Sequence, residues 1–258
     1  MAVSMSDLRT TFGVSGTVSL SQFYRGGNLV PNVSTNSAIA ESSTITLNSF
    51  SSRTNLVPVS YDVLGAGGGG GFGNQEDEGS SHSGETQASA GGSSSLSGSG
   101  FTTVTSTGGT AGASRSISGG SPYRYGTAGE SSAYGTGGVV QEDSVEGGAG
   151  SGAPSYRGGN GGIGAGGGGA GGDLSSLYDS GGWAGEGGGA GQRKTGTVNA
   201  VYKSTITLSC GAGGAGGNGP WASDGGNGGA GRVSITRQYL SGNLTTTRTT
   251  SGSQNVTV

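Results

Sequence analysis

The chain has 258 residues, 63 of them glycine, and only 29 % are hydrophobic, which is too little apolar side chain for one conventional core of that length. The net charge of −3 excludes a basic face for nucleic acid or an anionic membrane, and no apolar run approaches the roughly 20 residues of a bilayer span. With 5 prolines the chain cannot be collagen, and with Cys210 as its single cysteine it cannot form an internal disulfide. The N-terminus resembles no signal peptide, so we expect a soluble, cytoplasmically made protein.

The first residues predict a short helix. Ser6 can cap it, Leu8 and Phe12 share one face, and Gly13 ends the last turn.

A tandem repeat follows. Thr44 to Leu47 realign with Thr17 to Leu20 at an offset of 27 residues (47 − 20 = 27), and Phe50 realigns with Phe23. The sequence NLVP recurs at the same offset, so we interpret residues 1–56 as a module with two copies of one unit. Because apolar residues alternate with serines around Val18, each copy is predicted to be a strand, a turn and a strand.

Three later segments alternate in the way that half-buried strands do. They span residues 57–63, 201–210 (most cleanly from Thr205) and 232–236, and each adjoins a glycine-rich run. We therefore expect a small β-sandwich beside the glycine-rich runs, with Cys210 as a small residue that closes its strand.

Three heptads have glycine in two of every three positions: Gly158–Gly164 reads GGNGGIG, Gly213–Gly219 reads GGAGGNG and Gly225–Gly231 reads GGNGGAG. A threefold period fits an extended left-handed helix with three residues per turn and a rise of about 3.1 Å per residue. The pattern predicts packed polyglycine II helices at these three segments. The key packing glycines are Gly158, Gly161, Gly213, Gly216, Gly225 and Gly228. The alternative is a flexible glycine-serine linker. The overall fold class is thus mostly β and irregular, with almost no α-helix.

The segments between the glycine runs are expected to be loops at the ends of the block: 72–101, 121–134, 155–157, 173–183 and 220–224. They carry large aromatic side chains, which either cover helix ends or contact a partner. The candidate contact residues are Tyr123, Arg124, Tyr125, Tyr134, Tyr178, Trp183 and Trp221.

Nothing in the chain indicates an enzyme, a cofactor or a metal site. His82 is the only histidine and has no convincing nucleophile beside it. The segment 188–195 approaches a phosphate-binding loop but has Arg193 where that motif requires glycine. The acidic runs at 76–78 and 142–143 are typical of solvated loops.

Two resemblances concern function. The segment 19–27, SLSQFYRGG, with Val30-Pro31 after it, resembles a short motif of structural and tail proteins of tailed bacteriophages. The order of strand, glycine run, loops alternating with GGxGGxG, and closing strand is similar to the glycine-rich adhesins of T-even-type long tail fibres, although the N-terminal repeat does not resemble their attachment domain.

The resemblance implies that residues 57–240 form a polyglycine II domain whose loops contact a bacterial surface receptor, a protein or a polysaccharide. It also implies polyglycine II helices at 166–172 and 65–71 beside the three heptads. Residues 1–56 would mount this domain on other virion proteins, and 241–258 would be a terminal tail or strand. The mounting residues would be Phe23, Tyr24, Arg25 and Phe50. The expected location is the virion tail, with no nucleic acid or membrane insertion, and self-association stays open. The alternatives are a passive virion component and a cellular glycine-rich protein of the ice-binding or mycobacterial surface type.

Overall fold

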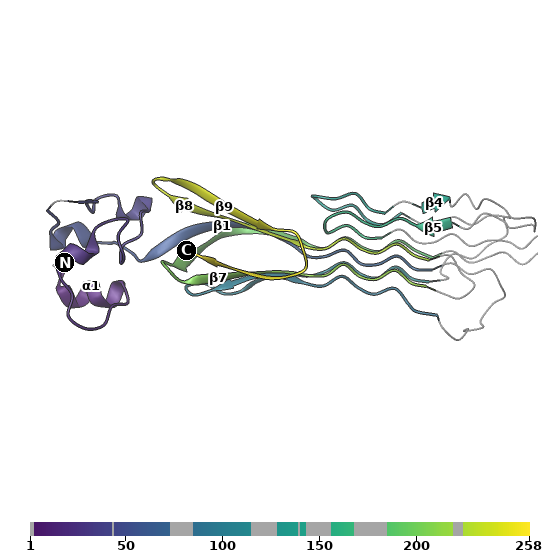
Figure 1. The fold of residues 1–258 in the computed structure, drawn as a ribbon, viewed down its shortest axis with the longest axis horizontal. Helices are drawn as coiled ribbons and strands as arrows, with labels where there is room; N and C mark the ends of the chain where they lie inside the picture. The colour runs from purple at the N-terminus through teal and green to yellow at the C-terminus, as the bar shows by residue number, and fades with distance from the viewer. Residues whose placement is uncertain are drawn as a thin grey trace, which may run out of the picture.

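The structure is a computed structural model, and it describes residues 3–42, 44–72, 85–114, 128–138, 140–142, 156–167, 185–218 and 224–258. The molecule is elongated (Figure 1), with an N-terminal module at one end, two β-sheets in the middle and a bundle of extended glycine-rich segments beyond them. The described residues are mostly β and contain one α-helix, α1 (Met5–Thr11). This confirms the predicted fold class of mostly β structure with almost no α-helix.

The N-terminal module begins with α1. Leu8 and Phe12 are both buried, as the sequence predicts. The cap is Ser4 rather than Ser6, because Ser4 and Asp7 form a reciprocal pair in which each side chain accepts from the other residue's backbone N–H.

The two repeat copies form 3₁₀-helices rather than the predicted strands: η1 (Leu20–Phe23) and η3 (Leu47–Phe50), with η2 (Ser34–Asn36) between them. In η1 the Ser19 N–H donates to the side chain of Gln22, and this local bond competes with strand pairing. The repeat itself holds, because Phe23 and Phe50 end equivalent turns. Their rings pack edge to face at 5.8 Å between centroids, and both contact Phe12.

The second halves of the copies diverge. In the first copy Gly26 has a φ of +79°, and its N–H donates to the Val30 carbonyl to close a turn. In the second copy Arg53 stands in the place of Gly26, and the chain runs on into strand β1.

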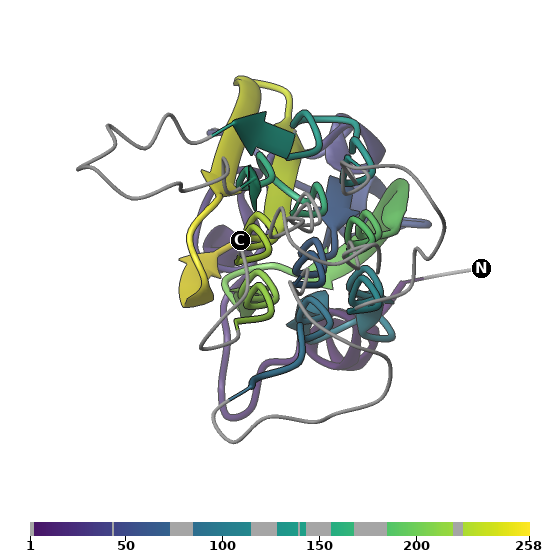
Figure 2. The ribbon, with the colours of Figure 1, turned by 90° about the vertical axis from the view of Figure 1, so that its right-hand side faces the viewer.

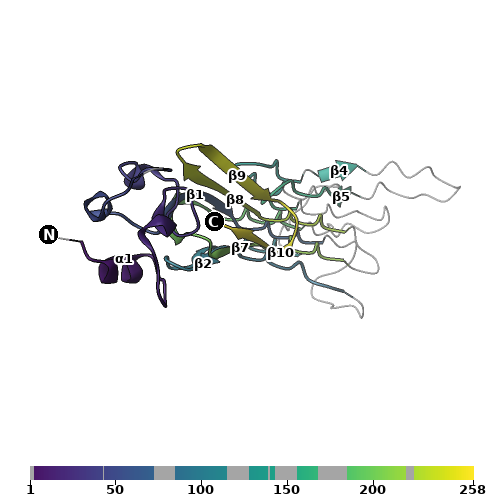
Figure 3. The same cartoon turned by 60° about the vertical axis from the view of Figure 1, so that its left-hand side comes forward.

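The middle of the molecule is a sandwich of two antiparallel four-stranded sheets. One has the order β6-β1-β8-β9 and the other β10-β7-β2-β3 (Figure 3). The strands are β1 (Leu56–Leu64), β2 (Ser94–Gly98), β3 (Val104–Ser106), β6 (Arg193–Val201), β7 (Thr205–Cys210), β8 (Arg232–Tyr239), β9 (Gly242–Arg248) and β10 (Gly252–Thr257). Buried side chains of both sheets make one core, which includes Val59, Leu96, Leu208 and Ile235.

The predicted strands at 57–63 and 232–236 are confirmed. The stretch 201–210 instead contains the end of β6, a turn in which Lys203 has a φ of +59°, and β7. Two expected loops are wrong, because 72–101 contains β2, and 155–157 falls largely in β5 (Tyr156–Gly158), which pairs with β4 (Val140–Glu142). The C-terminal stretch supplies β9 and β10.

The glycine-rich bundle is built around the segment 65–72, every residue of which is buried. Its backbone N–H groups donate to the carbonyls of three neighbouring segments in turn. Gly65, Gly68 and Gly71 donate to Gln192, Gly189 and Glu186 of one segment. Ala66 and Gly69 donate to Gly92 and Ser89 of a second, and Gly67 and Gly70 donate to Gly229 and Gly226 of a third. The bonding therefore repeats every three residues, whereas a strand repeats every two. Figure 2 views the bundle segments from their far ends.

The predicted glycine positions all contribute to this packing. Gly158, Gly161 and Gly228 donate to Asp224, Asn227 and Gly214, and Gly225 donates to Gly217. Gly216 donates to the side chain of Asn227, and a Cβ on Gly213 would collide with the carbonyl of Gly228.

The bundle also contains segments that the sequence did not indicate. They cover residues 85–92, 107–114, 128–138 and 185–192 and are joined to their neighbours by backbone hydrogen bonds. At the periphery, side chains replace carbonyls as acceptors: Asn160 accepts from the Asn227 N–H and Ser89 from the Ala215 N–H.

Candidate functional surfaces

Several of the described segments end at the far end of the bundle, away from the sheets and the N-terminal module. Phe72 and Ser114 end two of them, and the Phe72 N–H donates to the Ser114 hydroxyl. Thr86 and Asn218, near the ends of two others, exchange backbone hydrogen bonds with each other. We call the residues that join these segments the far-end connections, and they lie outside the described part of the chain.

The aromatic candidates belong mostly to those connections. Outside the described residues lie Tyr123, Arg124, Tyr125, Tyr178, Trp183 and Trp221. Their role as receptor contacts stays a prediction.

Tyr134 lies elsewhere, at the end of the bundle next to the sheets. The hairpin that carries it is closed by a Ser132 N–H bond to Gly135, and Tyr134 pairs with Ile163. Its hydroxyl donates to the carboxylate of Asp62 on β1, and its ring is 38 % exposed. Tyr134 thus joins the bundle to the sandwich and is separate from the far-end connections.

Two arginines complete this cluster. Arg193 on β6 binds both carboxylate oxygens of Asp62, at 3.0 and 2.9 Å, and donates to the Tyr134 hydroxyl at 2.9 Å. Arg232 on β8 lies 3.3 Å from Asp62, and its guanidinium sits 4.0 Å from the centre of the Tyr134 ring. The sequence analysis missed this cluster, because its four members lie far apart along the chain. Strand register brings Asp62, Arg193 and Arg232 together, and the bundle hairpin adds Tyr134.

The cluster shifts the titration of Asp62. Partial burial alone would raise the pKa of Asp62, but hydrogen bonds from Arg193 and Tyr134, together with the charges of Arg193 and Arg232, lower it below its usual value. The pKa of Arg193 is raised, chiefly by its hydrogen bonds to Asp62. The charged form of the cluster is therefore the stable one at neutral pH.

Of the four predicted mounting residues, two are internal. Phe23 and Phe50 are 0 % and 4 % exposed and form the core of the module, so they shape its surface rather than touch a partner. Arg25 is partly buried and is held by the Ile39 carbonyl, by Asn32 and by Glu41 at 3.3 Å.

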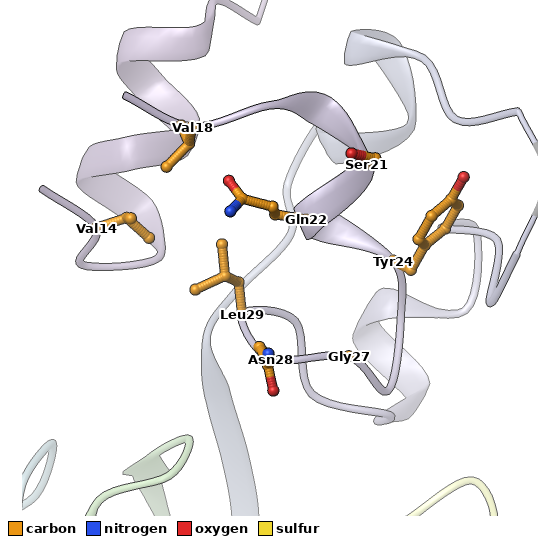
Figure 4. A pocket seen from close by; sticks show the side chains of 8 residues that line it. All are labelled: Val14, Val18, Ser21, Gln22, Tyr24, Gly27, Asn28 and Leu29. Carbon is orange, nitrogen blue, oxygen red and sulfur yellow. The ribbon is translucent and has the colours of Figure 1, made fainter. Parts of the chain in front are cut away.

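Tyr24, the fourth residue, lines a surface groove of the module (Figure 4) with a volume of 470 Å³. Val14, Val18 and Leu29 supply its apolar wall, and Figure 4 shows these three side chains and Gln22 converging. The polar part of the lining includes Ser21 and Asn28. The groove suits an apolar side chain or short segment of another protein.

The module is fastened to the sandwich. Tyr202 donates through its hydroxyl to the Gly27 carbonyl at 3.1 Å, and the Lys203 ammonium lies 2.8 Å from the side-chain oxygen of Asn28. Val33 is fully buried with the side chains of the sandwich core. Removing residues 1–56 would therefore uncover that core as well as delete the module.

The described residues were compared with what a metal site, a reactive thiol and a membrane span require. No group of three or more His, Cys, Asp or Glu side chains is placed there to hold a metal ion. Cys210 is buried at the end of β7, as predicted, and its burial raises the pKa of its thiol, which makes it a weak nucleophile. No helix among the described residues is long and apolar enough to span a membrane.

Comparisons with protein-family models, with curated proteins and with solved structures found no match to this chain. The resemblance to phage proteins therefore stays a prediction that rests on the sequence motifs quoted above.

Proposed function

We propose that this chain is a bacteriophage tail or tail-fibre protein, without enzymatic activity, that presents loops on a rigid glycine-rich scaffold for attachment to the host cell surface. The observation that carries the proposal is the two-ended architecture. A compact module that contains the phage-like SLSQFYRGG segment lies at one end, and a bundle of extended glycine-rich segments runs from the sheets toward the other (Figure 1).

The scaffold in this proposal is a polyglycine II block. Supporting it are the three-residue rotation of hydrogen bonds around 65–72 and the collisions that a Cβ would cause at glycines such as Gly67 and Gly228. A block fixed by backbone bonds holds its connections at set positions without a large apolar core, so the connections are free to vary in sequence.

The partners in the proposal are two. Other virion proteins would hold the N-terminal module, and a bacterial surface receptor, protein or polysaccharide, would contact the far-end connections. Large aromatic side chains are the residues that concentrate binding energy at interfaces.

Attachment is tested by replacing aromatic residues of the connections in phage particles. We expect Tyr123→Ala, Tyr125→Ala and Trp183→Ala each to lower adsorption to the host, by a factor of roughly 30 for a true anchor worth about 2 kcal/mol. Adsorption rate and melting temperature are measured together. Normal adsorption of all three variants would favour a passive virion component, and a matching loss of stability would mean that the rings cover helix ends.

Mounting is tested at the groove of Figure 4. Ser21→Arg places a bulky cation in its lining, and Ser42→Arg is the matched control at another exposed serine of the module. We expect fewer copies per particle for Ser21→Arg only, measured by quantitative mass spectrometry of purified virions. Equal copy numbers for both variants would place the mounting surface elsewhere.

A further inference from the structure

The outer face of the sheet β6-β1-β8-β9 is covered by hydroxyl and amide side chains in register. Inward positions of β1 and β8 are apolar, as Val59 and Ile235 show, so the alternate positions face outward. Strand register aligns outward residues in two complete cross-strand rows, Thr195–Asp62–Ser234–Thr247 and Thr197–Ser60–Thr236–Thr245, and the pairs Asn199–Pro58 and Gln238–Asn243 continue the pattern. Neighbouring residues within a row lie about 4.8 Å apart, and successive rows lie about 6.8 Å apart along the strands.

Neighbouring side chains of this face bond to one another. The Thr236 and Thr245 hydroxyls are 2.9 Å apart, and Gln238 donates to Ser60 at 2.9 Å. A hydroxyl has one donor and two acceptor sites, so each keeps bonding capacity toward a ligand. The outermost positions, Thr197 and Thr245, are exposed.

The face has little charge and little apolar surface. Among the described residues its one carboxylate, Asp62, is paired with Arg193 and Arg232, which leaves one net positive charge, and no large aliphatic side chain is exposed on it. Tyr134 adds an exposed aromatic ring at the edge nearest the bundle. A nucleic acid would need a field of basic side chains, and a protein partner would need apolar anchors, and this face offers neither.

We propose that this outer face binds a neutral polysaccharide chain. A neutral polyhydroxyl ligand exchanges hydrogen bonds with rows that carry both donors and acceptors, and the exposed part of the Tyr134 ring offers apolar surface to the sugar C–H groups. The site lies on the sandwich, away from the far-end connections, and does not depend on receptor binding by those connections.

The test uses the full chain and electrophoresis through gels that contain dextran, mannan or galactomannan, with alginate as the anionic probe. We expect at least one neutral polysaccharide to retard the protein. The variant Thr197→Val with Thr245→Val removes two hydroxyls and keeps β-branched side chains. Its affinity should fall about tenfold, as expected for two lost hydrogen bonds.

The matched control is Thr207→Val with Thr105→Val, which removes two hydroxyls from outward positions of the other sheet. It should bind as the original chain does. Thr245→Glu, at the exposed edge strand, should weaken binding by a second route. Absence of retardation by all three neutral polysaccharides, or an equal loss in the control, would overturn the proposal. Retained retardation in Tyr123→Ala, Tyr125→Ala and Trp183→Ala separates this site from the attachment loops.

Discussion

The sandwich and the glycine bundle of this molecule are packed by opposite means. In the sandwich, side chains such as Leu208 and Ile235 fill the space between sheets. In the bundle, the buried segment 65–71 has only the Ala66 methyl as a side chain, and its backbone N–H groups donate to three neighbours. The comparison teaches that a chain poor in apolar residues can build a buried centre from backbone pairing alone, provided that no Cβ separates the segments.

The largest loss of stability is therefore expected when a side chain is added to a buried glycine of the bundle. A Cβ on Gly228 would collide with the Gly67 carbonyl, and one on Gly161 with the Ala165 carbonyl. We expect Gly228→Val and Gly161→Val to cost about 4 kcal/mol or more, or to cause aggregation. Thermal unfolding and solubility are the measurements, and Ala215→Val, at an exposed position of the same bundle, is the control. If both glycine variants melt like the control, the segments are not closely packed.

Removing part of a side chain from the sandwich core should lower the free energy of unfolding by less and leave the chain folded. Leu208→Ala empties part of a core whose wall is apolar, at a cost of about 2–5 kcal/mol. Denaturant unfolding measures it, with Ile206→Val, at about 0.5–1.5 kcal/mol, as the graded comparison. Should Leu208→Ala unfold the chain more completely than Gly228→Val, the contrast between the two regions would be wrong.

The smallest effect is expected at the junction of the two regions. The pKa of Asp62 is lowered in the folded state, so its contribution is present above the unfolded pKa of about 3.9 and is lost as pH falls through the folded value. Asp62→Asn should cost about 1 kcal/mol or less at pH 7.

The measurement is the difference in melting temperature between the original chain and Asp62→Asn from pH 7 down to acid. We expect the difference to shrink below about pH 4. A constant difference across that range would mean that the Asp62 charge is not what joins Tyr134 to the sheet.

Sequence reasoning succeeded where one local pattern decides the structure. Alternation predicted β1 and β8, and the repeat offset paired Phe23 with Phe50. It failed where distant partners decide. The bundle segments 85–92 and 107–114 contain few glycine triplets and are extended because neighbours offer them hydrogen bonds. The cluster around Asp62 depends on the register between β1, β6 and β8, which no local pattern encodes.

The central claim is that segment 65–72 is the hydrogen-bonded centre of a folded block, and amide hydrogen exchange tests it most directly. Amides of Gly67, Gly68 and Gly69 donate to three different segments, whereas a glycine linker would leave them open to water. We predict that they exchange as slowly as the amides of Val59 and Val63 in β1. Exchange at the rate of an unstructured glycine peptide would contradict the account.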